Sequence, residues 1–159
     1  MSSGEPVADQ LPWERALGAR AIDSEHAGIQ SLVRDLNRLY LDEPALWEVD
    51  SDPSGFWWIE PNDADANVVA FARQSRDGER VLVFAANLSA VPREGYRLGL
   101  PRACRWREAI NTDSTYYGGS DVGNLGGVEP EPIPWHGQPV SAEVTLPPLA
   151  AIWLVPETE

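Results

Sequence analysis

The sequence of 159 residues contains no lysine, a single cysteine and only two histidines. Without lysine, neither a Schiff-base lysine nor the lysine of a phosphate-binding P-loop is available. The lone Cys104 excludes an internal disulfide and a multi-cysteine metal site, and His26 and His136 are too few for a three-histidine zinc site. The composition therefore predicts no metal and no cofactor.

Long hydrophobic runs are also missing. The longest apolar stretches, 81–86 and 149–155, fall well short of the roughly 20 residues that a membrane span needs. The first residues show no basic region followed by an apolar stretch, so no secretory signal is expected. The 12 basic residues are all arginine and are outnumbered by 25 acidic ones, and the net charge of −13 repels phosphate backbones and anionic lipid. These features predict a cytoplasmic protein that binds neither nucleic acid nor membrane.

The remaining composition is that of a globular protein, with 43% hydrophobic and 23% charged residues. The length predicts one domain with an appendage. Residues 1–24 lack sustained periodicity, and we expect a poorly ordered or remodelled segment there. Residues 25–46 contain the one clear helical pattern, and residues 47–159 change to a period of two.

The predicted helix covers residues 27–41. Its apolar side chains recur at helical spacing, with polar side chains between them. Asp23 or Ser24 can cap its start, and Pro44 ends it. The apolar stripe consists of Ile29, Leu32, Val33, Leu36, Leu39 and Tyr40.

The rest of the chain predicts short strands. Residues 68–73 and 80–88 flank a short turn that contains Gly78, which indicates a β-hairpin. Residues 140–146 alternate between apolar and polar side chains, as in a strand that water reaches on one side, and 150–155 form the last expected strand. Shorter candidates are 96–98 and 105–110. The predicted fold is mainly β, an antiparallel β-sandwich preceded by one amphipathic helix.

Several motifs fall short of a catalytic or metal site. Residues 62–67 resemble the start of a calcium-binding loop, but Val68 and Gln74 replace the required glycine and glutamate. The glycine-rich residues 118–127 lack the lysine of a phosphate cradle. No Gly-x-Ser-x-Gly elbow is present, and neither histidine has a partner implied by spacing. Acid pairs such as Asp50 and Asp52 are expected by chance among 25 carboxylates.

Aromatic side chains are the better candidates for a binding surface. Trp57 and Trp58 are adjacent, so in a strand they point to opposite faces, one into the core and one outward. An outward aromatic face can stack on a sugar ring or fill an interface. The same applies to the adjacent Tyr116 and Tyr117. We therefore take these four residues as candidate carbohydrate contacts.

Segments across about residues 25–157 form a series: LVRDLNRLY at 32–40, PALWEVD at 44–50, GFWWI at 55–59, WRE at 106–108, NTDS at 111–114, the glycine loop at 117–127, and LPPLAAIWLV at 146–155. Together they resemble the last barrel helix and the C-terminal all-β domain of 1,4-α-glucan (glycogen) branching enzymes, members of the α-amylase superfamily. Debranching or trehalose-forming relatives fit the NTDS segment and the glycine loop less well.

The resemblance implies a role in glycogen biosynthesis. Branching enzymes are glycosyltransferases that cleave an α-1,4 glucan and transfer the freed segment to form an α-1,6 branch. Their catalytic carboxylates lie at the ends of barrel strands, upstream of the region that this chain resembles, so the resemblance implies no catalytic residue here. It implies α-glucan as ligand and either a catalytic-barrel partner or self-association through the helix at 29–40. The alternatives are a stand-alone α-glucan-binding module and an accessory subunit that completes a barrel.

The glycine loop has a structural expectation of its own. At least one of Gly118, Gly119, Gly126 and Gly127 should have a positive φ. Asn111 or Asp113 should accept hydrogen bonds from loop backbone amides, since Asn and Asp side chains commonly do so in turns.

Overall fold

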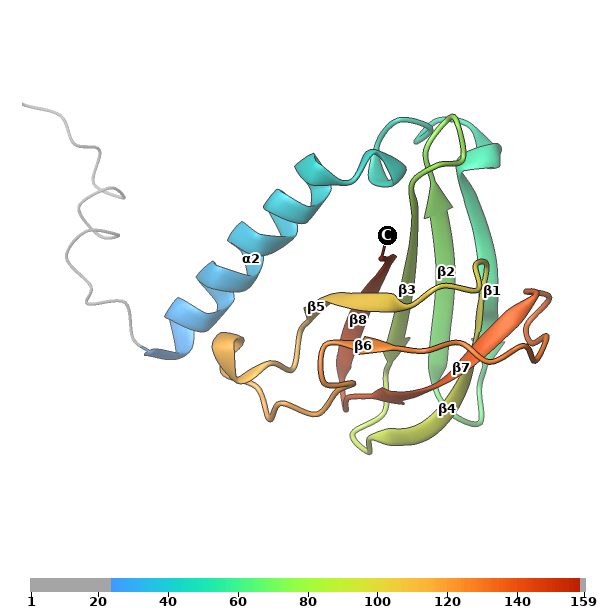
Figure 1. Cartoon of the computed structure of the whole chain (residues 1–159). Coiled ribbons are helices and arrows are strands. Elements are labelled where there is room, and N and C mark those ends of the chain that lie inside the picture. The colour runs from blue at the N-terminus through green and yellow to red at the C-terminus, as the bar shows by residue number, and fades with distance from the viewer. Residues whose placement is uncertain (1–23, 158–159) are drawn as a thin grey trace, which may run out of the picture.

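The computed structural model describes residues 24–157, which form two β-sheets with one long helix beside them (Figure 1). Residues 1–23, including the proposed helix cap Asp23, lie outside the described residues. The expectation for the segment 1–24 therefore concerns residues that the structure does not describe, except for Ser24. In chain order the elements are α2 (Ser24–Asp42), the short 3₁₀ helices η1 (Pro44–Leu46) and η2 (Pro53–Gly55), β1 (Phe56–Asp63), β2 (Val68–Gln74), β3 (Val81–Asn87), β4 (Arg93–Leu100), β5 (Trp106–Asn111), η3 (Thr115–Tyr117), β6 (Gly127–Val128), β7 (Val140–Leu146) and β8 (Ala150–Pro156).

The larger sheet has six strands in the order β1-β2-β3-β8-β5-β6, and β4 pairs with β7 in a second, two-stranded sheet. Every pair of strands is antiparallel. The prediction of a mainly β, antiparallel fold with one helix is thereby confirmed. Strand β3 lies between β2 and β8, and six of its seven residues are buried. This central position explains why its sequence is apolar on both faces.

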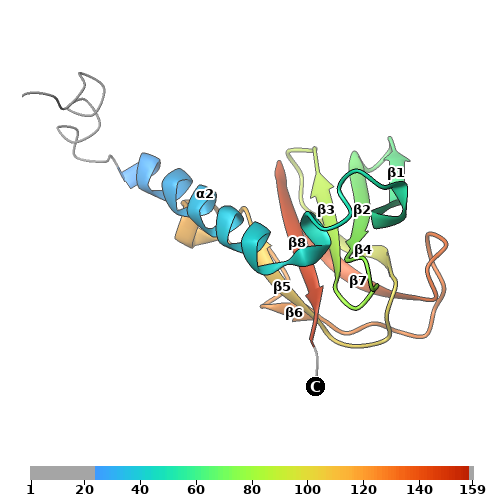
Figure 2. The ribbon, with the colours of Figure 1, turned by 90° about the horizontal axis from the view of Figure 1, so that it is seen from above.

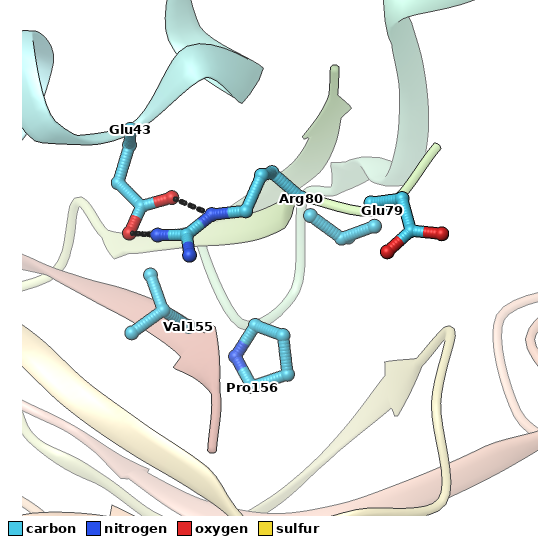
Figure 3. Close-up of a pocket in the computed structure, with 6 residues that line it drawn as sticks. Glu43, Glu79, Arg80, Val155 and Pro156 are labelled. Atoms are coloured by element: carbon cyan, nitrogen blue, oxygen red, sulfur yellow. Dashed lines mark hydrogen bonds and ion pairs between the residues drawn. The ribbon is translucent and has the colours of Figure 1, made fainter. Parts of the chain in front are cut away.

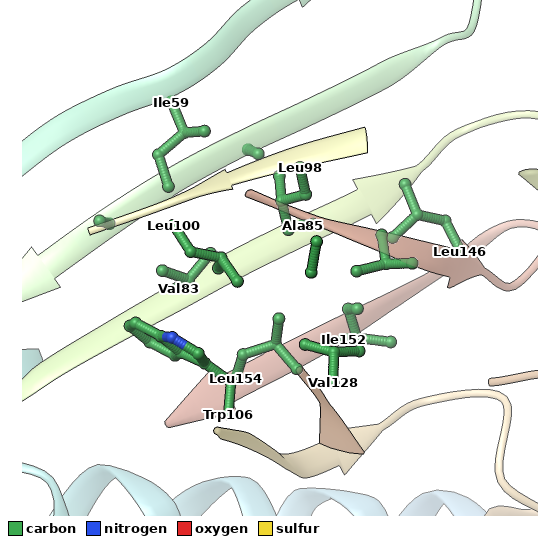
Figure 4. Close-up of a cluster of buried hydrophobic side chains, with 14 of the residues drawn as sticks. Ile59, Val83, Ala85, Leu98, Leu100, Trp106, Val128, Leu146, Ile152 and Leu154 are labelled. Atoms are coloured by element: carbon green, nitrogen blue, oxygen red, sulfur yellow. The ribbon is translucent and has the colours of Figure 1, made fainter. Parts of the chain in front are cut away.

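The core lies between the two sheets (Figure 4). Trp106 is its largest fully buried side chain, and its indole nitrogen donates a hydrogen bond to the carbonyl oxygen of Arg102 at 3.0 Å. The larger sheet contributes residues such as Val83 and Leu154, and the smaller sheet contributes residues such as Leu98 and Val144. Because a two-stranded sheet is marginal by itself, β4 and β7 depend on this packing.

The predicted strands are found close to their expected bounds. Strands β2 and β3 form the expected hairpin, and Gly78 in its turn has a φ of +73°. Residues 96–98 lie within the longer β4, and residues 105–110 overlap β5. The alternating residues 140–146 form β7, but water reaches its polar side only in part: Glu143 is exposed, whereas Ser141 is buried because the β6–β7 connection covers it and accepts its hydroxyl hydrogen bond. The period-two pattern of apolar residues therefore located these strands. The residues at which each strand begins and ends depend on its hydrogen bonds with the neighbouring strands.

The helix α2 begins at Ser24 and ends at Asp42, slightly beyond the predicted range on both sides. Directly after it, Glu43 is 5% exposed and accepts hydrogen bonds from Nε and Nη2 of Arg80 at 3.2 and 2.5 Å (Figure 3). Arg80 precedes β3, so this ion pair fixes the corner between helix and sheet. Pro44 then opens η1, which is consistent with its expected role as the end of the helix.

The apolar stripe of α2 is only partly covered. Leu32, Leu36 and Leu39 are half-buried, whereas Ile29 is 61% exposed and Val33 is 51% exposed. Figure 2 shows the N-terminal half of α2 extending past the sheets beside η3. No helix within residues 24–157 is long and apolar enough to cross a membrane.

Candidate functional site

The outer face of the six-stranded sheet carries an aromatic row of four side chains, one from each of β1, β2, β3 and β8. Strand register places them side by side, because each is the direct partner of the next across the sheet. Neighbouring ring centroids are 4.7–6.1 Å apart. The row consists of Trp58, Phe71, Phe84 and Trp153.

Helix α2 and η1 cover one side of this face. Leu39 and Leu46 pack with Trp153 against Leu82 and Val155 of the sheet. This contact anchors the C-terminal half of α2 on the outer face. It leaves the β1 end of the aromatic row exposed.

A groove of about 400 Å³ lies between α2 and the aromatic row. Within its lining, Arg73 Nη2 donates to Asp50 Oδ1 at 2.9 Å, and the Nε of Arg73 is buried without a hydrogen-bond partner among the described residues. Most of the lining is apolar, so the groove suits a neutral or apolar occupant better than a charged one. Its lining residues are Leu36, Asn37, Leu39, Tyr40, Leu46, Asp50, Arg73 and Trp153.

The two adjacent tryptophans point in opposite directions, as expected for a strand. Trp57 packs against the main core, whereas Trp58 lies on the outer face with 52% of its surface exposed. The ring of Trp58 meets Phe56 edge-on, with centroids 5.1 Å apart and planes at 87°. Of this pair, Trp58 is therefore the one that a ligand or partner can reach.

Tyr116 and Tyr117 hold α2 by a pair of hydrogen bonds, which we call the tyrosine clasp. Arg34 Nη2 donates to the hydroxyl of Tyr116 at 2.7 Å, and the hydroxyl of Tyr117 donates to Asp35 Oδ2 at 3.1 Å. Burial, and secondly the hydrogen bond to Asp35, raises the pKa of Tyr117 to about 12. The expected glucan-contact pair thus joins η3 to the helix, although Tyr116 keeps 61% of its surface exposed.

The glycine loop is shaped by backbone geometry. Gly118 and Gly126 have φ values of +90° and +94°, whereas Gly119 and Gly127 do not have positive φ. A Cβ atom on Gly119 would overlap the carbonyl oxygen of Asp113, so close packing accounts for this glycine. Leu125 has a φ of +52° and is fully exposed at the tip of the loop.

Side chains before the loop satisfy its amides. Asp113 accepts from the backbone nitrogens of Ser120 and Val122, both at 3.1 Å. Asn111 accepts from the nitrogen of Asp113 at 2.9 Å and donates to the carbonyl oxygen of Val122 at 2.8 Å. These amides have internal partners and are not free to cradle a phosphate.

The carboxylates of the acid pair and of the calcium-like segment also have structural partners. Asp50 pairs with Arg73, and Asp52 accepts from the nitrogen of Ser54 at 2.8 Å at the start of η2. The calcium-like segment is a turn in which Asp63 accepts from the nitrogen of Ala66 at 2.9 Å. Among residues 24–157 there is no cluster of three His, Cys, Asp or Glu side chains suited to a metal ion.

The aromatic row and the groove were not predicted from the sequence. The sequence signal was present, since an aromatic residue occurs in each of four apolar segments. Their alignment depends on the strand order and register, in which β8 from the end of the chain lies beside β3. The pattern of residues within one segment does not show that β8 lies beside β3.

Comparison with known proteins identifies the relatives of the chain. The 1,4-alpha-glucan branching enzyme GlgB of Mycobacterium tuberculosis (strain H37Rv) is 53% identical over 157 residues, which is 96% of this chain and 21% of that protein. The corresponding proteins of Aromatoleum aromaticum and Burkholderia vietnamiensis are both 53% identical, over 135 and 131 residues. They are matched over 85% and 82% of this chain, and over 21% and 18% of their own length.

The chain therefore spans about a fifth of the length of these relatives. Coverage of 96% also extends the similarity beyond residues 25–157, further than the sequence motifs indicated. A family model described as the alpha amylase C-terminal all-beta domain matches residues 58–157, which include every strand except the first two residues of β1. This match covers more than half of the sequence, and it shows that the chain belongs to the family of α-amylase C-terminal all-β domains.

Proposed function

We propose that this chain is the C-terminal unit of a 1,4-α-glucan branching enzyme, and that it braces the catalytic barrel without taking part in the chemistry. The similarity to branching enzymes over 96% of the chain supports this assignment. The process served is glycogen synthesis, and the compartment is the cytoplasm.

The observation that carries the proposal is the incomplete burial of the apolar stripe of α2. The helix is tied to the sandwich by the tyrosine clasp and by the contacts of Leu39. Ile29 and Val33 of the same stripe remain exposed to solvent. A helix shared between two structural units needs both properties, because each unit must bury part of its apolar surface.

The chemistry requires groups that belong to the barrel. Retaining transfer between sugars uses two carboxyl groups about 5–5.5 Å apart, one as nucleophile and one as acid and base. The acid pair of Asp50 and Asp52 is engaged with Arg73 and Ser54. This chain contributes position and stability, and Trp58 offers a contact for glucan at the β1 end of the aromatic row.

A complementation assay tests the proposal. The branching enzyme of M. tuberculosis, truncated to remove the region that this chain matches, is mixed with this chain, and branching is followed by the iodine–amylose spectrum. We expect neither part to shift the spectrum alone, and the mixture to do so. The double variant Ile29→Glu/Val33→Glu should fail to complement, whereas Arg38→Gln should succeed. A spectral shift produced by this chain alone would contradict the proposal.

A second candidate function is that of a stand-alone α-glucan-binding module, which the exposure of Trp58 favours. Such a module would bind glycogen without a catalytic partner and would not restore branching. Failed complementation combined with glycogen binding lost in Trp58→Ala would select this alternative. An accessory subunit that completes a barrel would behave like the first proposal in the complementation assay, and isolation of the complex from cells would identify its natural partner.

A further inference from the structure

The connection between β6 and β7 lies at the end of the sandwich away from α2. Figures 1 and 2 show this orange segment on the opposite side of the molecule from the helix. At its tip Trp135 is 47% exposed. A single exposed aromatic side chain does not by itself indicate a binding site. The backbone conformation and the contacts around Trp135 provide the further evidence.

Trp135 begins a tight two-residue turn. Its nitrogen donates to the carbonyl oxygen of Gln138 at 3.1 Å, and the nitrogen of Gln138 donates back at 2.8 Å. His136 and Gly137 at the centre have φ values of +50° and +71°, the pattern of a type I′ turn. Glycine suits this conformation, whereas histidine adopts it less readily. A non-glycine residue at such a φ persists where the surroundings determine it.

The surroundings of this turn do so. A Cβ atom on Gly99 of β4 would overlap the carbonyl oxygen of Trp135, so the turn lies directly against the strand backbone. The nitrogen of Gly99 donates to Nδ1 of His136 at 3.4 Å. Before the turn, Ser141 Oγ donates to the carbonyl oxygen of Ile133 at 2.7 Å. Trp135 is thus presented to solvent by a segment that is fixed on both sides.

Polar groups lie next to this aromatic surface. The ring of His136 is 5.7 Å from that of Trp135, and its Nε2 is 3.5 Å from Glu60 Oε2. Burial lowers the pKa of His136, so the ring is neutral at neutral pH. With Nδ1 accepting from Gly99, the proton of the neutral ring is on Nε2. The Nε2–H of His136 faces Glu60 and orients that carboxylate, so the site offers a carboxylate acceptor beside an indole face.

This combination selects one class of ligand. The carboxylates of Glu60 and Asp63, which lie near His136, repel anions. A pyranose ring presents an apolar C–H face to an indole and hydroxyl groups to a carboxylate acceptor. We propose that Trp135, with His136 and Glu60 beside it, forms a contact site for α-glucan at the end of the sandwich remote from α2. The α-linked class of sugar rests on the proposed function, whereas the preference for a neutral sugar rests on the geometry.

Native gel electrophoresis through glycogen tests the site on the full chain. Wild type should be retarded, and Trp135→Ala should bind about tenfold more weakly, as loss of a single anchoring aromatic predicts. Trp135→Phe should retain most of the binding, because it keeps an aromatic face. Trp47→Ala is the matched control, since Trp47 is 43% exposed elsewhere on the surface, and it should bind like wild type. Unchanged thermal unfolding midpoints establish that each variant is folded.

Three outcomes would overturn the site: wild type that glycogen does not retard, Trp135→Ala retarded as strongly as wild type, or equal losses for Trp135→Ala and Trp47→Ala. Sedimentation velocity provides a fourth outcome that would overturn the site. If Trp135→Ala abolishes self-association but leaves glycogen binding unchanged, the turn is a contact between copies of the chain and not a glucan site. Complementation by Trp135→Ala separates the two proposals. Restored branching with unchanged glycogen binding would refute only the site, and Trp135-dependent binding without complementation would refute only the bracing role.

Discussion

At the scale of single residues, a few hydrogen bonds join segments that are far apart in the chain. Tyr116 and Tyr117 each bond to a residue of α2 that lies 82 positions earlier. The Arg34 guanidinium donates to Asp35 and holds the pKa of that carboxyl below its usual value. Asp35 therefore stays ionised and remains a strong acceptor for Tyr117.

The first prediction concerns alkaline pH. The pKa of Tyr117 is raised from about 10 to about 12, so the folded state holds the phenolic proton more tightly than the unfolded state. The stabilisation is fully present below pH 10 and is lost as the pH rises towards 12. Chemical unfolding of wild type should show this loss, and Tyr117→Phe should show less of it. Equal pH dependence in the two proteins would contradict the role of the clasp.

The second prediction concerns the glycine loop. Asp113→Ala removes the acceptor for the amides of Ser120 and Val122, and we expect it to destabilise the protein by about 1–3 kcal/mol. Asp65→Ala is a suitable control because Asp65 lies exposed in a turn. Urea unfolding measures both. A change of stability no larger than that of the control would show that the loop keeps its shape without Asp113.

At the scale of elements, the close approach of α2 and η3 sets the third prediction. A Cβ atom on Gly28 would overlap the carbonyl oxygen of Tyr117. Gly28→Ala gains about 1 kcal/mol in helix propensity, but crowding against backbone costs about 1–3 kcal/mol and should separate the helix from η3. We expect faster amide hydrogen exchange in α2. Gln30→Ala, at an exposed helical position, should slow or preserve exchange.

The aromatic row shows how elements create a surface that no single element contains. Each of β1, β2, β3 and β8 contributes one ring, and the stacking of Phe71 on Phe84 at 4.7 Å joins two of them. Stacked and edge-to-face contacts of this kind add to the stability that burial provides. The row therefore serves both the cohesion of the sheet and the surface beside the groove.

At the scale of the whole molecule, the uncovered side of α2 determines how the chain behaves in solution. Full burial of each large apolar side chain is worth about 1.5–3 kcal/mol, and Ile29 and Val33 realise little of this in the single chain. Exposed apolar surface of this kind promotes association. The chain by itself should therefore form oligomers or aggregate.

The fourth prediction tests that behaviour with Leu36→Glu. Leu36 lines the groove and is half-buried, so a charge there should change the association through whichever surface Leu36 contacts. Arg38→Gln alters the net charge by the same amount from an exposed position and should leave association unchanged. Sedimentation velocity compares the three proteins. The prediction would be contradicted if wild type sediments as a compact monomer and Leu36→Glu sediments in the same way.

Local patterns in the sequence were sufficient to predict the individual elements and the family. The helix and the β2–β3 hairpin follow from apolar spacing of 3.6 and 2, which depends only on residues near each other in the chain. Segment motifs indicated a resemblance to the C-terminal region of branching enzymes, and the 53% identity to such an enzyme over 96% of the chain, with the α-amylase C-terminal domain match over residues 58–157, bears this out. The opposite orientations of Trp57 and Trp58 were also predictable, because they follow from strand geometry.

Which of these two tryptophans faces outward was not predictable from the sequence, since that depends on the sheet against which β1 packs. The same holds for the hydrogen bonds of Tyr116 and Tyr117 to α2, for the row of four aromatic rings, and for the packing of Trp135 against Gly99. Each of these facts joins residues far apart in sequence. They depend on strand order and register, which are set by packing of the whole chain and leave no periodic signature in any one segment.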